Sequence, residues 1–577
     1  MVKPGSSVRL KSEQDAIRHP DFFKGAKMPQ TMTGGEAIVR AVLKHDVDTI
    51  YGLPGAQMYP LYDALHRLSN DVRTITSRHE QGAAYMAYGH AKSTGRVGVY
   101  TVVPGPGVLN TTAALATAWA TDTSVLCLTG QVPSQYLGQR RGHLHEIPDQ
   151  LETLRSLLKW ADRIDCPAEA PKLVNEAFVQ MRSNRPGPVS LEMCWDTMSS
   201  SQEVDILPPE NLPAPASADP DEITAAAKLL EGAKRIMIIT GGGALNASKE
   251  VTALAEALGG GVTSMRSGRG VVSEDHACGM SSAAGLETWP ETDVLIGIGS
   301  RLEMPYVRWA SGGDRIERPE TPPYLIRIDI DPDEMNRLVP HAGIVADAAI
   351  GATALTDAVT KVRKPESDAL DYIANARAVA AKKIQSIQPQ IGYLQVIRDV
   401  LPRDGFFVEE LCQAGFASYY GFPVYEPRTF VTSGFQGTLG YGFPTALGVK
   451  AANPSKAVIS ITGDGGFMYG MPELATAVQF NLGVVVVLFN NSAFGNVRRD
   501  QINAYEGRTL GVDLVNPDFV ALAESFGVAA TRVISPEALR PALEKAIDRD
   551  APSLIEIPID PDQEASPWPF IIPGAYV

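Results

Sequence analysis

The sequence predicts an α/β protein made of three doubly wound parallel-sheet domains. Short apolar, β-branched runs alternate with helical patterns along most of the chain, and this alternation is typical of parallel sheets. The chain has 577 residues, which is too many for one hydrophobic core. A stretch rich in Pro, Ala and Ser, from Leu207 to Pro220, separates two alternating regions and is typical of a linker.

These patterns divide the chain into five segments. The predicted segments are an N-terminal extension (1–30), a first domain (31–200), a central domain (221–365), a third domain (385–560) and a C-terminal tail (561–577).

Apolar runs mark the expected strands of the first two domains. In the first domain they cover 49–51, 97–102 and 124–128. In the central domain a strand over 235–240 leads into the glycine triplet Gly241-Gly242-Gly243. A charged helical stretch around 375–387 connects the central domain to the third.

Bulk composition excludes several classes of function. Hydrophobic residues make up 44% and charged residues 20%, as in ordinary globular proteins. The formal net charge of −15 argues against nucleic acid or an anionic membrane as a partner. No apolar run reaches transmembrane length, and the first thirty residues lack the apolar core of a secretory signal. The five cysteines have neither metal-ligand nor redox spacing, so we expect free thiols and a cytoplasmic protein.

The most informative motif is Gly463-Asp464-Gly465-Gly466. It follows a β-branched run over 456–462 that predicts a strand. Glycines allow a sharp turn and a close approach of backbone N–H groups to an anion. The stretch 472–478 then predicts a helix, and helix N-termini favour phosphate. The motif therefore predicts a diphosphate cradle; the alternative is a tight strand–helix turn without a ligand.

A second buried run, 484–489, ends at Asn490 and Asn491. Asp464 offers a carboxylate oxygen and Asn491 an amide oxygen, which suit Mg²⁺ completed by water and phosphate. The carbonyl of Ala493 is a further candidate ligand.

Together these motifs resemble the signature of thiamine diphosphate (ThDP) enzymes of the acetolactate synthase-like family. That family includes acetohydroxyacid synthases, 2-hydroxyacyl-CoA lyases and benzoylformate decarboxylases. The block from Arg78 to Ala84 resembles the one that carries the family's activating glutamate. Other matches, in family order between about residues 31 and 560, are 49–56, 103–110, Arg185-Pro186-Gly187-Pro188-Val189 and Asn516-Pro517-Asp518-Phe519.

The resemblance implies ThDP and Mg²⁺ as cofactors and assigns a role to several residues. Glu80 takes the position of the carboxylate that bonds the ring nitrogen of the aminopyrimidine, and burial there would favour its protonated form. Leu439 stands where the family places an apolar wedge beneath the bent cofactor, and Gln413 where it often contacts the diphosphate. The implied metal ligands are Asp464, Asn491 and Ala493. The implied cofactor-binding residues are Gly55, Ala56, Glu80, Asn110, Gln413, Gly437, Leu439, Gly463, Asp464, Gly465, Gly466, Asn491 and Phe494.

The resemblance also implies an oligomer. Glu80 lies in the first domain and Asp464 in the third, and the family joins these domains from two subunits around one cofactor. A homodimer or homotetramer acting on a small-molecule substrate is therefore expected. The central domain of such enzymes holds FAD, ADP or no nucleotide, and the glycine triplet is compatible with each.

The residues expected around the substrate depart from those of true acetolactate synthases. Ser492-Ala493-Phe494 replaces an acidic pair and Gln, Asp500 replaces a Trp, and 301–305 lacks the arginine that would bind the acceptor. His143 and His145 stand where relatives place polar residues over the reacting carbon, so we predict that they shuttle protons. The alternative is a pair of surface loop histidines.

Three functions remain open from the sequence. The first is an acetolactate synthase-like carboligase or lyase acting on 2-oxo acids or related carbonyl substrates. The second is a 2-oxo acid decarboxylase or a 2-hydroxyacyl-CoA lyase on the same fold. The third is a catalytically inactive, nucleotide-binding homologue.

Overall fold

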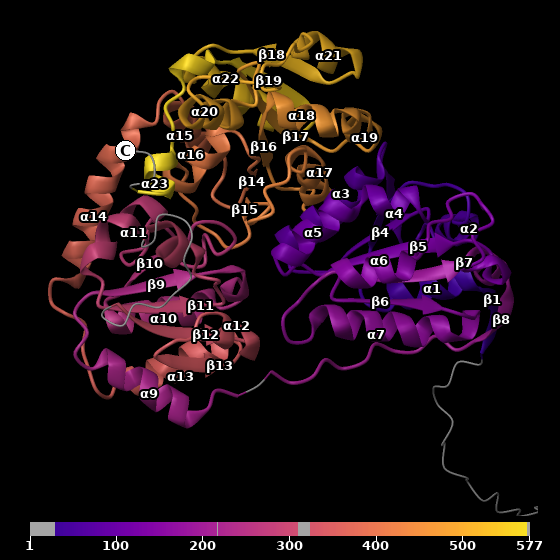
Figure 1. The fold of residues 1–577 in the computed structure, drawn as a ribbon, viewed down its shortest axis with the longest axis horizontal. Helices are drawn as coiled ribbons and strands as arrows, with labels where there is room; N and C mark the ends of the chain where they lie inside the picture. Colours follow the sequence, from indigo (N-terminus) through magenta and orange to yellow (C-terminus); the bar gives the residue numbers. More distant parts are fainter. Residues whose placement is uncertain (1–28, 216, 310–322, 574–577) are drawn as a thin grey trace, which may run out of the picture.

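The computed structural model describes residues 29–215, 217–309 and 323–573, and these form three parallel sheets covered by helices (Figure 1). The predicted fold class is confirmed. Residues 1–28 of the predicted extension and 574–577 of the predicted tail lie outside the described residues. All five cysteines are free thiols. No helix in the described part of the chain is long and apolar enough to cross a bilayer.

The first sheet has six strands in the order β3-β2-β4-β5-β7-β6. Strands β2, β4, β5 and β7 are buried along their whole length, which explains their continuous apolar runs. The strands are β2 (Thr49–Gly52), β3 (Arg73–Thr76), β4 (Gly98–Val102), β5 (Val125–Gln131), β6 (Trp160–Ile164) and β7 (Val189–Cys194). Its helices are α1 (Gly34–Leu43), α2 (Tyr59–Arg67), α3 (Glu80–Thr94), α4 (Pro106–Asn110), α5 (Thr112–Ala120), α6 (Gln150–Leu157), α7 (Ala170–Arg182) and α8 (Trp195–Ser199).

A small antiparallel pair closes the first domain. Strand β1 (Gln30–Thr33) pairs with β8 (Ser201–Val204). The described residues between β8 and α9 (Pro220–Leu230), 205–215 and 217–219, form no helix or strand, as the linker composition predicts.

The central sheet has five strands in the order β10-β9-β11-β12-β13. They are β9 (Ile236–Thr240), β10 (Gly261–Thr263), β11 (Val294–Ile298), β12 (Tyr324–Asp329) and β13 (Ala342–Val345). The helices after α9 are α10 (Ser248–Leu258), α11 (Ser282–Thr288), α12 (Pro332–Arg337), α13 (Ala348–Val359) and the connecting helix α14 (Ala369–Lys383).

The third sheet has six strands in the order β15-β14-β16-β17-β19-β18. They are β14 (Phe406–Val408), β15 (Phe430–Val431), β16 (Val458–Gly463), β17 (Val484–Asn490), β18 (Ala529–Arg532) and β19 (Ser553–Pro558). Its helices are α15 (Gln390–Val400), α16 (Gln413–Gly421), α17 (Gly442–Ala452), α18 (Asp464–Gly470), α19 (Leu474–Gln479), α20 (Gly495–Ala504), α21 (Phe519–Ser525), α22 (Pro536–Arg549) and α23 (Trp568–Ile571).

The helix after the glycine motif begins earlier than the sequence predicts. A helix was expected over 472–478, but α18 already begins at Asp464, and a 3₁₀ turn precedes α19. The chain turns at Gly463, which has φ −85° and ψ 160° and caps α18. Gly466 thus lies inside the helix, where a Cβ atom would stand 2.6 Å from Oε1 of Glu410. Close packing, rather than a turn, explains this glycine.

Helices α3 and α17 join the first domain to the third (Figure 1). A Cβ on Gly89 of α3 would lie 2.1 Å from the carbonyl oxygen of Thr445, and one on Gly448 of α17 would lie 1.9 Å from that of Met86. The two helices therefore touch backbone to backbone. The carboxylate of Glu473 strengthens the junction by accepting hydrogen bonds from the N–H groups of Arg78 and His79, each with its nearest oxygen at 3.0 Å.

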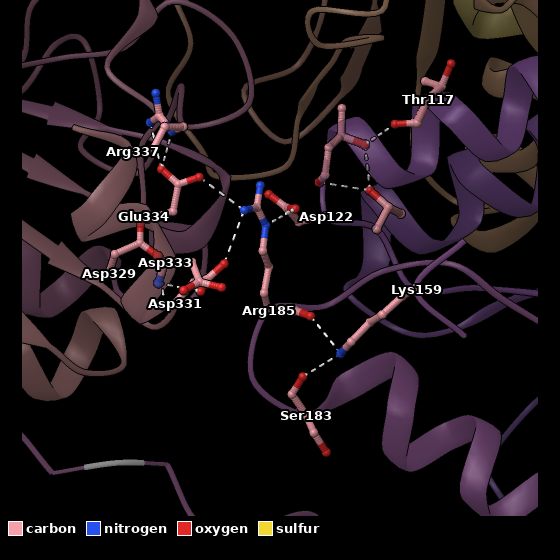
Figure 2. A network of polar contacts seen from close by, with 12 residues as sticks. Thr117, Asp122, Lys159, Ser183, Arg185, Asp329, Asp331, Asp333, Glu334 and Arg337 are labelled. Atoms are coloured by element: carbon pink, nitrogen blue, oxygen red, sulfur yellow. Dashed lines mark hydrogen bonds and ion pairs between the residues drawn. The ribbon is translucent and has the colours of Figure 1, made fainter. Parts of the chain in front are cut away.

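An arginine joins the first domain to the central one (Figure 2). Nε of Arg185 lies 2.7 Å from Oδ1 of Asp122, and its Nη1 lies 3.1 Å from Oε1 of Glu334 and 3.3 Å from Oδ2 of Asp331. The Lys159 ammonium donates to the Arg185 carbonyl at 2.8 Å. The motif that begins at Arg185 in the sequence is thus part of a domain junction.

Candidate active site

A cavity of about 270 Å³ opens at the carboxyl ends of β14, β16 and β17. Ligands of open parallel sheets bind at this edge. In the described chain, every residue that lines it lies between Leu411 and Glu564. The lining includes ten residues predicted to bind cofactor or metal: Gln413, Gly437, Leu439, Gly463, Asp464, Gly465, Gly466, Asn491, Ala493 and Phe494.

Asp464 is the first residue of α18 and is only 1% exposed. Oδ2 of Asp464 accepts a hydrogen bond of 2.7 Å from Nδ2 of Asn516, and the same Nδ2 donates to Oδ1 of Asn490 at 3.0 Å. Burial raises the pKa of Asp464, against the hydrogen bonds from Asn516 and from backbone N–H groups, which lower it. A bound cation would stabilise the ionised carboxylate of Asp464 and lower its pKa.

Asn491 and Ala493 face the same cavity from the end of β17. Ser492 between them has φ +52°, so the chain turns in the left-handed region. Oδ1 of Asn491 accepts from the N–H of Ala493 at 3.1 Å, and its Nδ2 donates to Oε2 of Glu564 at 2.7 Å. Burial, together with the charge of Asp464, raises the pKa of Glu564 to about 7, against a hydrogen bond from Asn491.

The oxygen donors fit a hard divalent cation. A carboxylate, an amide oxygen and a backbone carbonyl are the ligand types that Mg²⁺ takes beside phosphate and water. No cluster of three or more His, Cys, Asp or Glu residues with metal-binding geometry occurs in the described ranges. A metal here would therefore depend on the mixed oxygen donors of Asp464, Asn491 and Ala493.

Gln413 provides an unpaired polar atom in the cavity wall. It begins α16, it is 7% exposed, and its buried Oε1 has no hydrogen-bond partner among the described residues. Buried polar groups are normally paired, so an unpaired one that lines a cavity indicates a polar ligand.

A hydrogen bond to the buried Glu410 holds the loop that carries Leu439. Leu439 is half-buried in the cavity wall, between Gly437 at φ +60° and Gly440 at φ +79°. The N–H of Gly440 donates to Oε1 of the fully buried Glu410. Burial raises the pKa of Glu410 to about 7, while a hydrogen bond from Thr462 lowers it.

Glu80 lies on another surface of the chain. It begins α3, it is half-buried rather than buried, and its Oε2 accepts from Nδ2 of Asn110 at 2.9 Å. Gly55 and Ala56 follow β2, and a Cβ on Gly55 would lie 2.5 Å from Cγ1 of Val103. The single chain therefore groups the predicted residues into two separate sets, one in each outer domain.

The two predicted histidines have different surroundings. Nδ1 of His145 lies 2.8 Å from Oε1 of Gln57. Burial lowers the pKa of His145, and the nearby charge of Glu80 raises it, so the ring stands beside the Glu80 set. His143 instead stacks on Tyr136, with ring centroids 4.1 Å apart.

A second cavity, of about 120 Å³, lies at the carboxyl ends of β9 and β11, and residues 120–122 of the first domain and 434–435 of the third also line it. Gly241, Gly242, Ser300 and Arg301 line it. The guanidinium of Arg301 lies 4.6 Å from the ring centroid of Phe435, which belongs to the third domain. The third glycine of the triplet, Gly243, does not line this cavity; its Cα packs against Gly299.

Comparison with known families matches all three domains. Models of thiamine pyrophosphate enzymes match residues 32–153 as the N-terminal binding domain, 223–355 as the central domain and 412–557 as the C-terminal binding domain. A probable acetolactate synthase large subunit of Methanocaldococcus jannaschii is 35% identical over 94% of each chain. The chain belongs to the thiamine pyrophosphate enzyme family. It is an acetolactate synthase-like enzyme of the carboligase and lyase class.

Two further relatives are named for different activities. The acetolactate synthase large subunit of Corynebacterium glutamicum is 31% identical over 95% of this chain and 90% of its own. A probable 2-ketoarginine decarboxylase of Pseudomonas aeruginosa is also 31% identical, over 92% and 94% of the two chains. An acetolactate synthase and a protein named as a decarboxylase are thus equally similar in sequence to this thiamine pyrophosphate enzyme.

Sequence reasoning missed three polar residues of the site. Asn516 belongs to a motif of the resembled family, but the sequence does not indicate that its Nδ2 donates to Asp464. Glu410 and Glu564 carried no signal of their own, because their contacts join segments 52 and 73 positions apart. The adjacent acidic pair Glu409-Glu410 at the end of a buried strand was the one pattern that could have pointed to Glu410.

Proposed function

We propose that this enzyme uses ThDP and Mg²⁺ to form or cleave a carbon–carbon bond beside the carbonyl of a 2-oxo acid. The cavity between β14, β16 and β17 carries the proposal, since one wall of it combines hard oxygen donors, an unpaired amide and an apolar wedge. Bound ThDP supplies the carbon nucleophile and the electron sink.

The metal and the diphosphate are assigned to the third domain. Asp464, Asn491 and the carbonyl of Ala493 would hold Mg²⁺. Gln413 and the backbone around Gly465 would bind the diphosphate. The cavity that these residues share supports the assignment.

The catalytic carboxylate is assigned to a second subunit. Glu80, oriented by Asn110 at 2.9 Å, would hold a proton at the aminopyrimidine ring nitrogen. His145 would exchange protons with the substrate, and Gly55 and Ala56 would border the ring. The absence of first-domain residues from the lining of the described cavity supports a site between subunits, and hence a homodimer or homotetramer.

One relative favours decarboxylation as a second candidate. The Pseudomonas aeruginosa protein is named for a 2-keto acid decarboxylase at 31% identity. The same residues could serve a 2-hydroxyacyl-CoA lyase. The joint presence of Glu80, Leu439, Asp464 and Asn491 argues against an inactive homologue.

Three finer predictions accompany the proposal. The central cavity would hold part of FAD or ADP, supported by its glycines and the Arg301 guanidinium. The domain boundaries would be 31–200, 221–365 and 385–560. The protein would act in the cytoplasm.

A substrate screen tests the proposal. The purified chain is incubated with ThDP, Mg²⁺ and a panel of 2-oxo acids and 2-hydroxyacyl-CoAs, and products are identified by mass spectrometry. We expect ThDP-dependent turnover of at least one 2-oxo acid. Consumption of no 2-oxo acid, with ThDP bound, would overturn the proposal. An absorption spectrum of the same sample reports flavin.

A further inference from the structure

The chain returns to the cavity after its last strand. Beyond β19 it makes a 3₁₀ turn at Pro561–Gln563, and the next residue, Glu564, lines the cavity beside Asp464 and Asn491. Oε2 of Glu564 accepts from Nδ2 of Asn491 at 2.7 Å. This contact spans 73 positions, so the C-terminal segment places a carboxylate at the oxygen-donor wall.

We propose that Glu564 is a positioning residue for the divalent cation, because it fixes the orientation of the Asn491 amide. Because Oε2 of Glu564 accepts from the NH₂ end of the amide, the amide oxygen points away from Glu564. That oxygen accepts from the N–H of Ala493 at 3.1 Å and keeps its second lone pair for a ligand. The inference rests on the proposed metal site.

The neighbouring contacts hold Glu564 in this position from two sides. The N–H of Ala565 donates to the Gln388 carbonyl at 3.0 Å, and Nε2 of Gln390 donates to the Ala565 carbonyl at 3.1 Å. These bonds join the segment to the start of α15.

On the other side the segment is joined to α20, whose first residues line the cavity. Nη1 of Arg499 donates to Oγ of Ser566 at 2.7 Å, and Nε1 of Trp568 donates to Oδ1 of Asn496 at 2.6 Å. The segment that carries Glu564 is therefore coupled to the same wall that carries Asn491. Side chains that orient metal ligands commonly contribute 10–100-fold in metal affinity.

Mn²⁺ titration followed by electron paramagnetic resonance tests the inference on the full-length chain with ThDP present. We expect Glu564→Ala to weaken Mn²⁺ binding by roughly 10–100-fold. Glu564→Gln keeps an acceptor for the Asn491 amide and should weaken binding less. Asp562→Asn is the matched control, because Asp562 lies on the same segment but pairs with Arg498 at 3.1 Å with its side chain 76% exposed; it should bind Mn²⁺ as the wild type does.

A double-mutant cycle separates positioning from general loss of structure. If Glu564 acts through Asn491, then Asn491→Ala combined with Glu564→Ala should bind Mn²⁺ about as weakly as Asn491→Ala alone. Additive losses, or wild-type Mn²⁺ affinity in Glu564→Ala, would overturn the inference. Asp464→Ala distinguishes failure of the proposed metal site from failure of the positioning role. Unchanged Mn²⁺ binding in Asp464→Ala would refute the metal site itself. Weaker Mn²⁺ binding in Asp464→Ala, together with wild-type binding in Glu564→Ala, would refute only the positioning role of Glu564. Circular dichroism confirms that each variant is folded.

Discussion

Oε2 of Glu410 accepts a hydrogen bond of 2.5 Å from the hydroxyl of Thr462, two residues before Asp464. The other oxygen of the same carboxylate accepts from the N–H of Gly440, next to Leu439. One fully buried side chain therefore ties the loop of the predicted cofactor wedge to the strand that leads to the predicted metal ligand. Neither residue could be linked to the other from the sequence, since 52 positions separate Glu410 from Thr462.

Removal of that carboxylate should loosen the wedge. Glu410→Ala leaves the Gly440 N–H without its acceptor and leaves the Thr462 hydroxyl only the Gly463 carbonyl at 3.1 Å. An unsatisfied buried group costs about 1–3 kcal/mol. We expect a lower thermal midpoint and weaker ThDP binding by calorimetry. Glu410→Gln keeps an acceptor and should retain more of both. Unchanged ThDP affinity in Glu410→Ala would show that the wedge loop holds its place alone.

The raised pKa of the Glu410 carboxyl predicts that the stability of the fold depends on pH. Burial raises the pKa of Glu410 from 4.5 to about 7, so the folded chain keeps a proton that the unfolded chain releases. Its contribution to stability is therefore fully present below pH 4.5, falls as the pH rises from 4.5 to about 7, and is constant above. In cofactor-free protein, Glu410→Gln should lose this slope. Parallel stability–pH curves for wild type and variant would contradict the assignment.

The sequence correctly predicts the elements that depend on interactions between residues close together in the chain. Continuous β-branched runs correctly predict strands β2, β4, β9, β16 and β17, because strands buried on both faces need apolar side chains throughout. The sequence does not predict the start of α18, because its glycines are typical of a turn. The packing partner that explains Gly466, Glu410, lies far away in the sequence.

In the candidate site, too, the sequence predicts the residues that belong to local motifs and misses those whose contacts join distant segments. Motif resemblance predicts Asp464, Asn491 and Leu439, and the structure gathers them in one cavity. It does not predict Glu564 or the role of Asn516, whose contacts depend on how distant segments meet. The burial expected of Glu80 needs a surface that a single chain does not provide, so it stays a prediction about the assembly.

Mixed oligomers test the site between subunits. Glu80→Gln keeps the side chain's size but cannot exchange the proton, and Asp464→Ala removes a metal ligand, so each homo-oligomer should be inactive. Hybrids should regain partial activity, because one site combines an intact first domain with an intact third domain. Native mass spectrometry verifies subunit exchange. Proven exchange without any activity would rule out a shared site.

His145 should matter more than His143. His145 contacts Gln57 at 2.8 Å and lies near Glu80, whereas His143 stacks on Tyr136. Loss of general acid–base help typically costs ~10²–10⁴-fold, so we expect His145→Ala to lower kcat on that scale with little change in ThDP affinity. The exposed His66 provides a control, and His66→Ala should be neutral. Equal kcat in His145→Ala and wild type would leave His145 as a loop residue.

The contact between α3 and α17 should tolerate no added side chain. A Cβ on Gly448 would lie 1.9 Å from the carbonyl oxygen of Met86, so Gly448→Ala must push the helices apart. Overpacking of this kind costs typically about 1–3 kcal/mol, which outweighs the gain of up to about 1 kcal/mol that alanine brings to a helix. A lower thermal unfolding midpoint is therefore expected. Gly232→Ala is the matched control, since its Cβ would meet nothing within 4 Å, and it should leave the midpoint nearly unchanged. Equal midpoints for the two variants would mean that the helices can separate without cost. Because Glu80 begins α3, Gly448→Ala should also displace that carboxylate and reduce turnover even at temperatures where the variant is fully folded.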